Sequence, residues 1–134
     1  MFGALDISTS ALVAQRLRLD VISGNIANAK TILNADGEYE PYRRRAVMLA
    51  EGDPASGSAH GVHVARIDLD TGPLQPRYEP NSPHADADGY VYYPNVNPLV
   101  EQVNALEAAR SYEANIAAAE ATKSMVSVAL ELLA

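Results

Sequence analysis

The residues whose types and spacing could support chemistry are the three histidines and two nearby aspartates in the middle of the chain. His60 and His63 lie close together, and His84 is followed at intervals of two by Asp86 and Asp88. Imidazole and carboxylate groups bind metals, and the aspartates begin like a calcium-binding loop, but the distal bidentate glutamate is absent at the required spacing. The first two histidines fall at a predicted loop-to-strand junction, not on one helix face. We therefore expect no metal site, and we interpret Asp88 as a turn residue that bonds backbone amides.

The other candidate chemical groups are a basic cluster and a run of hydroxyl side chains. Arg43, Arg44 and Arg45 would alternate between opposite faces of a strand, so they do not form one phosphate-binding patch. We expect a salt-bridged surface and not a nucleic-acid site, and an acidic neighbouring chain is one candidate partner for it. Residues 8–10 carry hydroxyl groups but have no nearby histidine, and no glycine-rich phosphate loop or nucleophile elbow is present. The sequence therefore predicts neither an enzyme nor a cofactor.

Composition excludes several further classes of protein. The 134 residues suffice for about one domain, and the net charge of −7 argues against general nucleic-acid affinity. The absence of cysteine excludes disulfides and thiolate metal sites. No apolar run approaches the ~20 residues of a membrane span, and we recognise no cleavable secretory signal. These features fit a cytoplasmic protein or export by a route without a cleaved signal.

The last third of the chain, residues 97–134, predicts one long helix. Asn97 is a suitable N-cap, Pro98 suits the first helical position, and no glycine or proline follows. Apolar or small residues recur at steps of three and four, which predicts one stripe along the helix. These positions are Leu99, Val103, Leu106, Ala109, Tyr112, Ile116, Ala119, Val126, Leu130 and Leu133. A cluster of alanines and an uncapped apolar end indicate a helix made to pack between other helices.

A second helix is predicted over residues 5–29. Leu5, Leu12, Leu19 and Ile26 are seven apart, and Ser8, Gln15, Ile22 and Ala29 fill the intervening positions of a half-polar coiled-coil seam. Asp6 or Ser8 could cap its start, and we expect it to end near Lys30. The simplest arrangement pairs the two helices as an α-helical coiled coil. Because one stripe per helix buries little surface, neighbouring chains would have to supply further burial.

The middle of the chain, residues 35–96, predicts a small β module that is rich in proline and tyrosine. Residues 42–49 and 62–69 are candidate strands, separated by a mobile loop of small residues at 51–60. Prolines limit the next segment to an edge strand or an extended loop, and a turn at Asp88 and Gly89 precedes an extended piece at 90–93. The predicted fold is mainly α, with terminal segments 1–34 and 97–134 paired and the β module between them. A module of this size is too small for an enzyme-sized cleft.

Both ends of the chain resemble a known family. Residues 8–31 resemble the N-terminal signature of bacterial flagellar rod and hook proteins, and residues 83–97 and 103–125 are similar to the proximal rod proteins of that family. Asp88 stands where relatives often carry asparagine, and both residues suit a turn. The residues that carry the resemblance are Asn25, Ile26, Ala27, Asn28, Ala29, Thr31, Asp88, Gly89, Tyr90, Val91, Pro94, Asn95, Arg110, Ser111 and Tyr112.

The resemblance implies a non-enzymatic building block of the flagellar basal body. Such a protein leaves the cell unfolded through the flagellar type III export apparatus, with its export information in the N-terminal region and no cleaved signal. It assembles in the periplasmic space into a helical rod that transmits motor torque and encloses the export channel. Its expected partners are copies of itself, other rod proteins, the rod-base adaptor and the membrane-embedded ring. Neither nucleic-acid binding nor direct insertion into the membrane is implied.

We expect the assembly interface to lie on the apolar positions of both terminal helices. They are Leu5, Leu12, Leu19, Ile22, Ile26, Leu99, Val103, Leu106, Ala109, Tyr112, Ile116, Val126, Leu130 and Leu133. Three alternatives stay open on sequence grounds. They are a cytoplasmic helical adaptor or coiled-coil scaffold, another rod protein of the same family, and a small metal-dependent enzyme.

Overall fold

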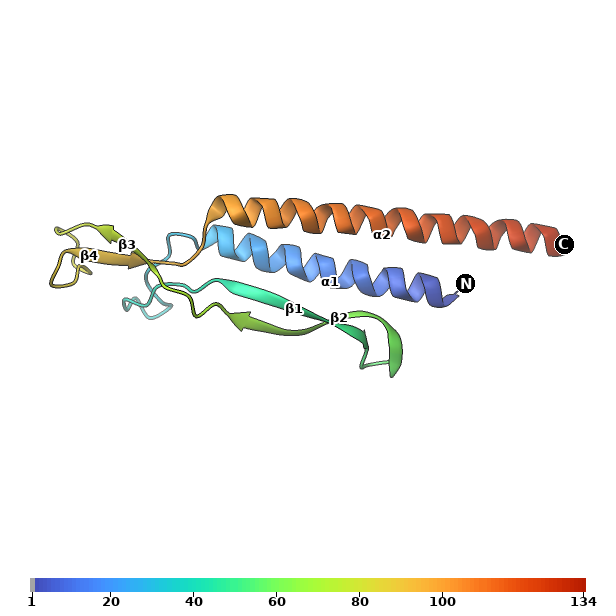
Figure 1. Cartoon of the computed structure of the whole chain (residues 1–134), viewed down its shortest axis with the longest axis horizontal. Coiled ribbons are helices and arrows are strands. Elements are labelled where there is room, and N and C mark those ends of the chain that lie inside the picture. Colours follow the sequence, from blue (N-terminus) through green and yellow to red (C-terminus); the bar gives the residue numbers. More distant parts are fainter. Residues whose placement is uncertain (1) are drawn as a thin grey trace.

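The computed structural model describes residues 2–134 and consists of two long helices with two short antiparallel sheets (Figure 1). The helices α1 and α2 run antiparallel side by side, and the hairpin formed by β1 and β2 packs against α1 (Figure 1). The sheet formed by β3 and β4 lies beyond the point where α1 ends and α2 begins (Figure 1). In chain order the elements are α1 (Phe2–Ala27), β1 (Arg45–Asp53), β2 (Ser58–Leu69), β3 (Gln75–Tyr78), β4 (Tyr90–Tyr93) and α2 (Pro98–Leu133). The predicted mainly α fold with a small β part is confirmed, but the β part is two separate sheets.

Helix α2 begins where the sequence predicts. Asn97 has an extended backbone, and its side-chain oxygen accepts hydrogen bonds from the amides of Leu99 (3.0 Å) and Val100 (3.4 Å). The 36 residues of the helix span about 54 Å. In Figure 1, α2 continues past the N-terminal end of α1. Leu132 and Leu133 are 83% and 84% exposed there, so the predicted uncovered apolar end is confirmed. No helix within residues 2–134 combines the length and apolarity that crossing a membrane requires.

Helix α1 begins three residues before the predicted start. Asp6 and Ser8 therefore lie inside the helix, and the prediction that one of them caps it is wrong. The helix ends at Ala27, so Ala29 lies in the following turn and not on the seam. Asn28 closes the end, since both its backbone and side-chain nitrogens donate to the carbonyl oxygen of Gly24. Thr31 in turn donates its hydroxyl hydrogen to the side-chain oxygen of Asn28 at 3.2 Å.

The predicted seam of α1 lies on the buried side of the helix. Leu5, Ser8, Leu12, Gln15, Leu19, Ile22 and Ile26 are all buried or half-buried. Val13 and Leu17, which the seam excludes, are exposed. The side-chain oxygen of Gln15 is buried and has no hydrogen-bond partner among the described residues. A polar group at such a position costs stability, and in helix pairs it commonly fixes the register.

The β1–β2 hairpin is longer than predicted. The segment at 51–60, expected as a loop, is strand except for the four-residue turn at 54–57, and β1 starts three residues later than expected. Its small residues lack a clear alternation of polar and apolar positions, so the local pattern is weak. Contact with α1 stabilises these strand residues, because the hydroxyl oxygen of Ser10 accepts a hydrogen bond from the amide of Val62 at 3.1 Å. Tertiary packing of this kind often outweighs strand propensity.

The β3–β4 sheet matches the predicted edge strand and extended piece. The register pairs Gln75 with Tyr93 and Tyr78 with Tyr90. The turn before β4 is built by Asp86, whose carboxylate accepts the amides of Asp88 (3.0 Å) and Tyr90 (2.9 Å). The prediction that Asp88 plays this part is therefore wrong by two residues.

Candidate functional site

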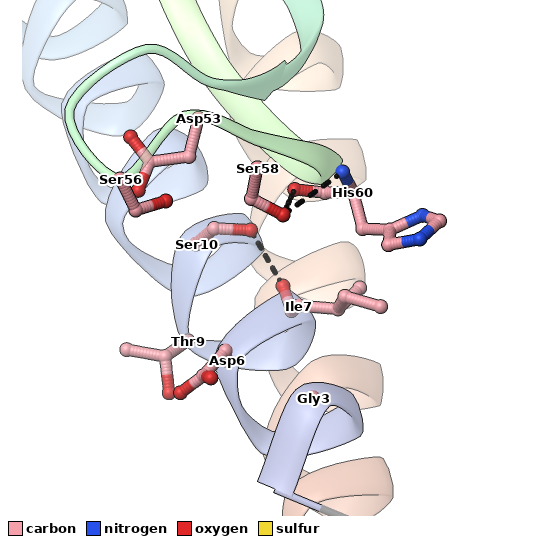
Figure 2. A pocket seen from close by; sticks show the side chains of 9 residues that line it. All are labelled: Gly3, Asp6, Ile7, Thr9, Ser10, Asp53, Ser56, Ser58 and His60. Carbon is pink, nitrogen blue, oxygen red and sulfur yellow. Dashed lines mark hydrogen bonds between the residues drawn. The ribbon is translucent and has the colours of Figure 1, made fainter.

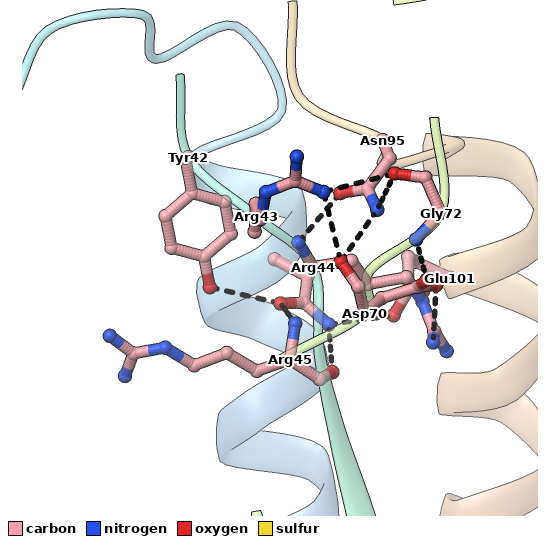
Figure 3. Close-up of polar contacts among 9 residues, drawn as sticks. Tyr42, Arg43, Arg44, Arg45, Asp70, Gly72, Asn95 and Glu101 are labelled. Carbon is pink, nitrogen blue, oxygen red and sulfur yellow. Dashed lines mark hydrogen bonds and ion pairs between the residues drawn. The ribbon is translucent and has the colours of Figure 1, made fainter. Parts of the chain in front are cut away.

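Four segments of the chain meet in a cluster of polar side chains, which we call the polar junction. It lies where α1 ends and α2 begins, next to the start of β1 and the turn after β2, and Figure 3 shows it from close by. Its members are Asn25, Tyr42, Arg43, Arg44, Arg45, Asp70, Gly72, Asn95 and Glu101. The junction is the most extensively hydrogen-bonded polar cluster of the described chain.

Asn25 holds the start of β1 against α1. Its side-chain oxygen accepts from the Arg45 amide (3.0 Å) and from the Tyr42 hydroxyl (2.9 Å). Its side-chain nitrogen donates to the Arg45 carbonyl (2.8 Å) and to Glu101 (3.3 Å). The amide thus pairs with both backbone groups of Arg45, as a neighbouring strand would. Asn25 is completely buried, and all its hydrogen-bonding capacity is used.

Glu101 is the buried acidic residue of the polar junction. It is 1% exposed and accepts hydrogen bonds from the Arg44 guanidinium and from Asn25. The Arg44 guanidinium also lies 3.7 Å from the carboxylate of Asp70. Glu101 sits in the first turn of α2, where the helix dipole favours a negative charge. A buried carboxylate needs such partners, because burying it unpaired would cost several kcal/mol.

The remaining contacts fix the turn after β2 to the entrance of α2. Asn95 accepts from the amide of Arg44 (2.9 Å) and donates to the carbonyl of Asp70 (3.1 Å). The Arg43 guanidinium donates to the carbonyls of Asp70 (3.3 Å) and Gly72 (3.0 Å). The salt-bridged surface predicted for the arginine cluster is present at Arg44, but its acidic partners, Glu101 and Asp70, belong to this chain and not to a neighbour. The Arg45 guanidinium lies over the ring of Tyr42.

The histidines weighed as metal ligands lie in different surroundings. The His63 ring lies 2.8 Å from the carbonyl oxygen of Gly52, and the His84 ring stacks on Tyr39 with centroids 5.2 Å apart. Across residues 2–134, no three histidine, aspartate or glutamate side chains are grouped so that they could hold a metal ion. The three histidines therefore do not form one group of potential ligands.

A pocket of about 480 Å³ lies between the hairpin turn and the first turns of α1 (Figure 2). Its polar groups serve local structure. Ser10 donates to the carbonyl of Ile7 (2.7 Å) and accepts from Val62 (3.1 Å). Hydrogen bonds from Ser56 and from the Ala55 amide hold the pKa of Asp53 below its usual value. This arrangement closes a hairpin turn and does not present a nucleophile to a base.

The predicted stripe on α2 divides between two faces of the helix. Leu99, Val103 and Leu106 are 68%, 59% and 54% exposed, whereas Glu101 and Ala108 are buried. Repeated steps of three cover about 300° each, so they rotate around the helix instead of following one face. The prediction of a single stripe is therefore wrong. The buried and half-buried positions alternate in steps of four and three: Glu101, Ala105, Ala108, Tyr112, Asn115, Ala119, Thr122 and Val126. Ala109 is half-buried at their margin.

The opposite side of α2 carries the side chains that stay exposed, and we call it the outward face. It consists of Leu99, Val103 and Leu106 near the start and Met125, Val128 and Leu132 near the end, all of them more than half exposed. Single exposed apolar side chains are common, but two groups of them on one side of a helix make that side a candidate for contact with another protein.

Several residues of the family signature lie where elements of the structure join. Asn25 and Asn95 belong to the polar junction, Asn28 and Thr31 close α1, and Val91 and Pro94 are buried near β4. Tyr112 lies on the half-buried side of α2, and the backbone carbonyl of Ser111 accepts a hydrogen bond from the side chain of Asn115 (2.8 Å).

The sequence analysis did not predict the role of Glu101 or its pairing with Arg44. The sequence does contain a signal for it, since Glu101 precedes Ala105 by four residues and Ala108 by seven and therefore shares their face of the helix.

Comparison with known proteins gives consistent results along the chain. Residues 5–31 match the family described as "Flagella basal body rod protein", and residues 87–132 match "Flagellar basal body rod FlgEFG protein C-terminal". The chain is 43% identical to "Flagellar basal-body rod protein FlgC" of Bacillus subtilis, with 98% of this chain and 97% of that protein covered. It is also 43% identical to the protein of that name from Salmonella typhimurium, with the same coverage. The counterpart from Borreliella burgdorferi is 39% identical, with 99% and 97% covered.

Proposed function

Since the chain belongs to the FlgC family of flagellar basal-body rod proteins, and is therefore a structural rod subunit and not an enzyme, we propose that it assembles through the outward face of α2. The observation that carries this proposal is the exposure of Leu99, Val103 and Leu106 on a helix whose opposite side is already packed. Covering these side chains would remove apolar surface from water at about 25 cal/mol per Å². A neighbouring subunit is the natural cover in a repeating rod.

The same packing is our basis for assigning parts of the subunit to the inside and the outside of the rod. We assign residues 1–34 and 97–134 to the inner layer of the rod and residues 35–96 to the outside. The four-three alternation on the packed side of α2 supports coiled-coil geometry for the helix pair. Leu5, Leu12, Leu19, Ile22 and Ile26 then serve the pair within one subunit, and the outward face serves contacts between subunits. Ile116, Leu130 and Leu133 are exposed enough to join those contacts.

The polar junction suits a part that carries torque. It connects α1, α2 and the β1–β2 hairpin through buried, charge-assisted hydrogen bonds, so a load on one segment passes to the others. We propose that the helices line the export channel and that the rod meets other rod proteins, the rod-base adaptor and the membrane-embedded ring. The subunit acts in the periplasmic space after export without a cleaved signal.

Cysteine labelling tests the proposed interface, because the chain contains no cysteine of its own. Leu106→Cys should react readily with a maleimide in the purified monomer and at least tenfold more slowly in isolated basal bodies. Ala55→Cys, in the exposed hairpin turn, is the control for reagent access. Equal reactivity of Leu106→Cys in monomer and basal bodies would contradict the proposal.

A further inference from the structure

One face of the β3–β4 sheet is aromatic and exposed. The register pairs Pro76 with Tyr92 and Tyr78 with Tyr90. Residues directly opposite in an antiparallel pair share a face, and alternate residues do too. Pro76, Tyr78, Tyr90 and Tyr92 therefore form one surface, which we call the aromatic face. Its tyrosines are 66%, 41% and 40% exposed, whereas Val91 on the other face is completely buried.

The rings of the aromatic face are held in place although they are exposed. Tyr78 and Tyr90 meet edge to face with centroids 5.4 Å apart. A Cβ on Gly89 would lie 3.0 Å from the Tyr78 ring, so a glycine lets that ring lie close to the turn. At the other side, the Tyr39 hydroxyl bonds both backbone groups of Tyr92, at 2.8 and 3.1 Å, and its ring stacks on His84. Rings ordered in advance lose little entropy when a partner binds.

The segments around the aromatic face are acidic. Residues 31–41, which carry Tyr39, contain Asp36, Glu38 and Glu40 and no lysine or arginine. Residues 78–97 contain Asp86 and Asp88 in the turn before β4 and likewise no lysine or arginine, whereas Glu79 in the same segment accepts from the Tyr93 hydroxyl on the opposite face. Arg77 alternates to the opposite face, where its guanidinium lies over the Tyr93 ring at 4.4 Å. Carboxylates and the negative faces of tyrosine rings both attract guanidinium and ammonium groups.

We propose that the aromatic face docks an arginine- or lysine-bearing segment of a protein other than this chain. A two-stranded sheet is only marginally stable alone, so an uncovered aromatic surface on it gains from a partner. Tyrosine is enriched at protein interfaces, and the acidic border selects a basic occupant by charge complementarity. The β3–β4 sheet, which carries the aromatic face, lies beyond the end of α1, and the overhang of α2 lies at the other end of the molecule (Figure 1). The subunit can thus use this surface and the overhang of α2 at the same time.

The first test is a titration in solution that needs no rod assembly. Nitrogen-15-labelled protein is titrated with a hexa-arginine peptide, with a hexa-glutamate peptide as the charge control. Shift changes should concentrate at Tyr78, Tyr90 and Tyr92. Tyr78→Ser and the double variant Glu38→Gln, Asp88→Asn should each weaken the apparent affinity at least threefold. Ile67→Ser, which alters an exposed side chain of β2, should leave it unchanged. Shift changes spread evenly over the acidic surface would overturn the proposal.

The second test identifies the occupant in cells. A photo-crosslinking amino acid is placed at Tyr78, and the crosslinked peptide from isolated basal bodies is identified by mass spectrometry. A segment of another protein with an excess of arginine and lysine is the expected product. A crosslink to a second copy of this chain, a crosslink to a segment without basic residues, or no crosslink in assembled basal bodies would overturn the proposal.

Discussion

Asn25 is the residue on which the polar junction depends. Among the side chains of α1 that the structure describes, it alone bonds both the start of β1 and the first turn of α2, across 20 and 76 residues of sequence. Its amide has two donors and two acceptor sites, and each has a partner here. An aspartate would lose the donors and add a charge beside Glu101. The position therefore requires asparagine for a physical reason.

Replacing Asn25 should destabilise the folded monomer. Asn25→Ala leaves the backbone groups of Arg45 and one oxygen of Glu101 without their partner, and each buried unpaired group costs about 1–3 kcal/mol. We expect the free energy of unfolding, measured by urea denaturation, to fall by about 2–4 kcal/mol. Asn81→Ala, at an exposed position, is the matched control. A loss under about 0.5 kcal/mol for Asn25→Ala, the range of ordinary surface changes, would refute this role.

Two glycines should respond in opposite directions to the same substitution. Gly61 has φ +96°, and a Cβ there would lie 2.7 Å from the Ser10 hydroxyl, which joins the hairpin to α1. Gly61→Ala should therefore lower the free energy of unfolding by about 1–3 kcal/mol. Gly24 lies in α1 with open space around its Cβ position. Gly24→Ala should raise stability by up to about 1 kcal/mol. Urea midpoints that shift in the same direction for both variants would contradict this account.

At the level of single residues, the sequence predicted local features better than long-range partners. Asn97 as N-cap follows from local chemistry, and the structure confirms it. Asn25 belonged to a recognised signature, but nothing local showed that it pairs with Arg45 and Glu101. The Asp88 prediction failed for a similar reason, since two aspartates spaced by two residues offer equivalent turn chemistry. Only the fold decides that Asp86 faces the amides.

Among the elements, α2 shows how a periodic pattern can mislead. Apolar residues at steps of three and four predict a long helix, and its ends are nearly correct. The same pattern assigns residues of two opposite faces to one stripe, because alanines and polar residues occupy the packed side while leucines and valines stay exposed. Hydrophobicity alone therefore points to the wrong side of this helix. The face that packs against α1 needed small residues for close approach, which a count of apolar residues does not distinguish.

The two ends of α2 should differ in stability. Glu101 and Ala108 are buried, whereas Met125, Val128, Leu130 and Leu132 are more than half exposed. A helix without tertiary contacts is marginal in water, so its overhang opens readily. We expect fast amide hydrogen exchange over residues 126–133 of the purified monomer and slower exchange over residues 101–112. Equal protection along the whole helix in a verified monomer would contradict this expectation.

The whole molecule is a layered rod segment whose surfaces differ in character. The hairpin, α1 and α2 lie side by side, with the β3–β4 sheet beyond one end and the α2 overhang at the other (Figure 1). Helix pairing could be anticipated from the seam of α1. The separation of the β part into two sheets could not, because it depends on contacts of the hairpin with α1. Most of the chain's exposed leucine and valine lies on α2, which makes that helix the main candidate for assembly.

The most direct test is to place one charge on the outward face of α2 and to count rods. Leu106→Asp should leave the monomer folded, because the side chain is 54% exposed, and circular dichroism and urea denaturation of the purified variant verify this. In an assembled rod the same carboxylate would be buried without a partner at every copy, at a cost of several kcal/mol each. We predict that cells with Leu106→Asp lack rods in electron micrographs of basal bodies and do not swim. Ala55→Asp, in the exposed hairpin turn, should form normal rods at equal expression. Normal rods and swimming with a folded Leu106→Asp subunit would contradict the central claim that this face assembles the rod.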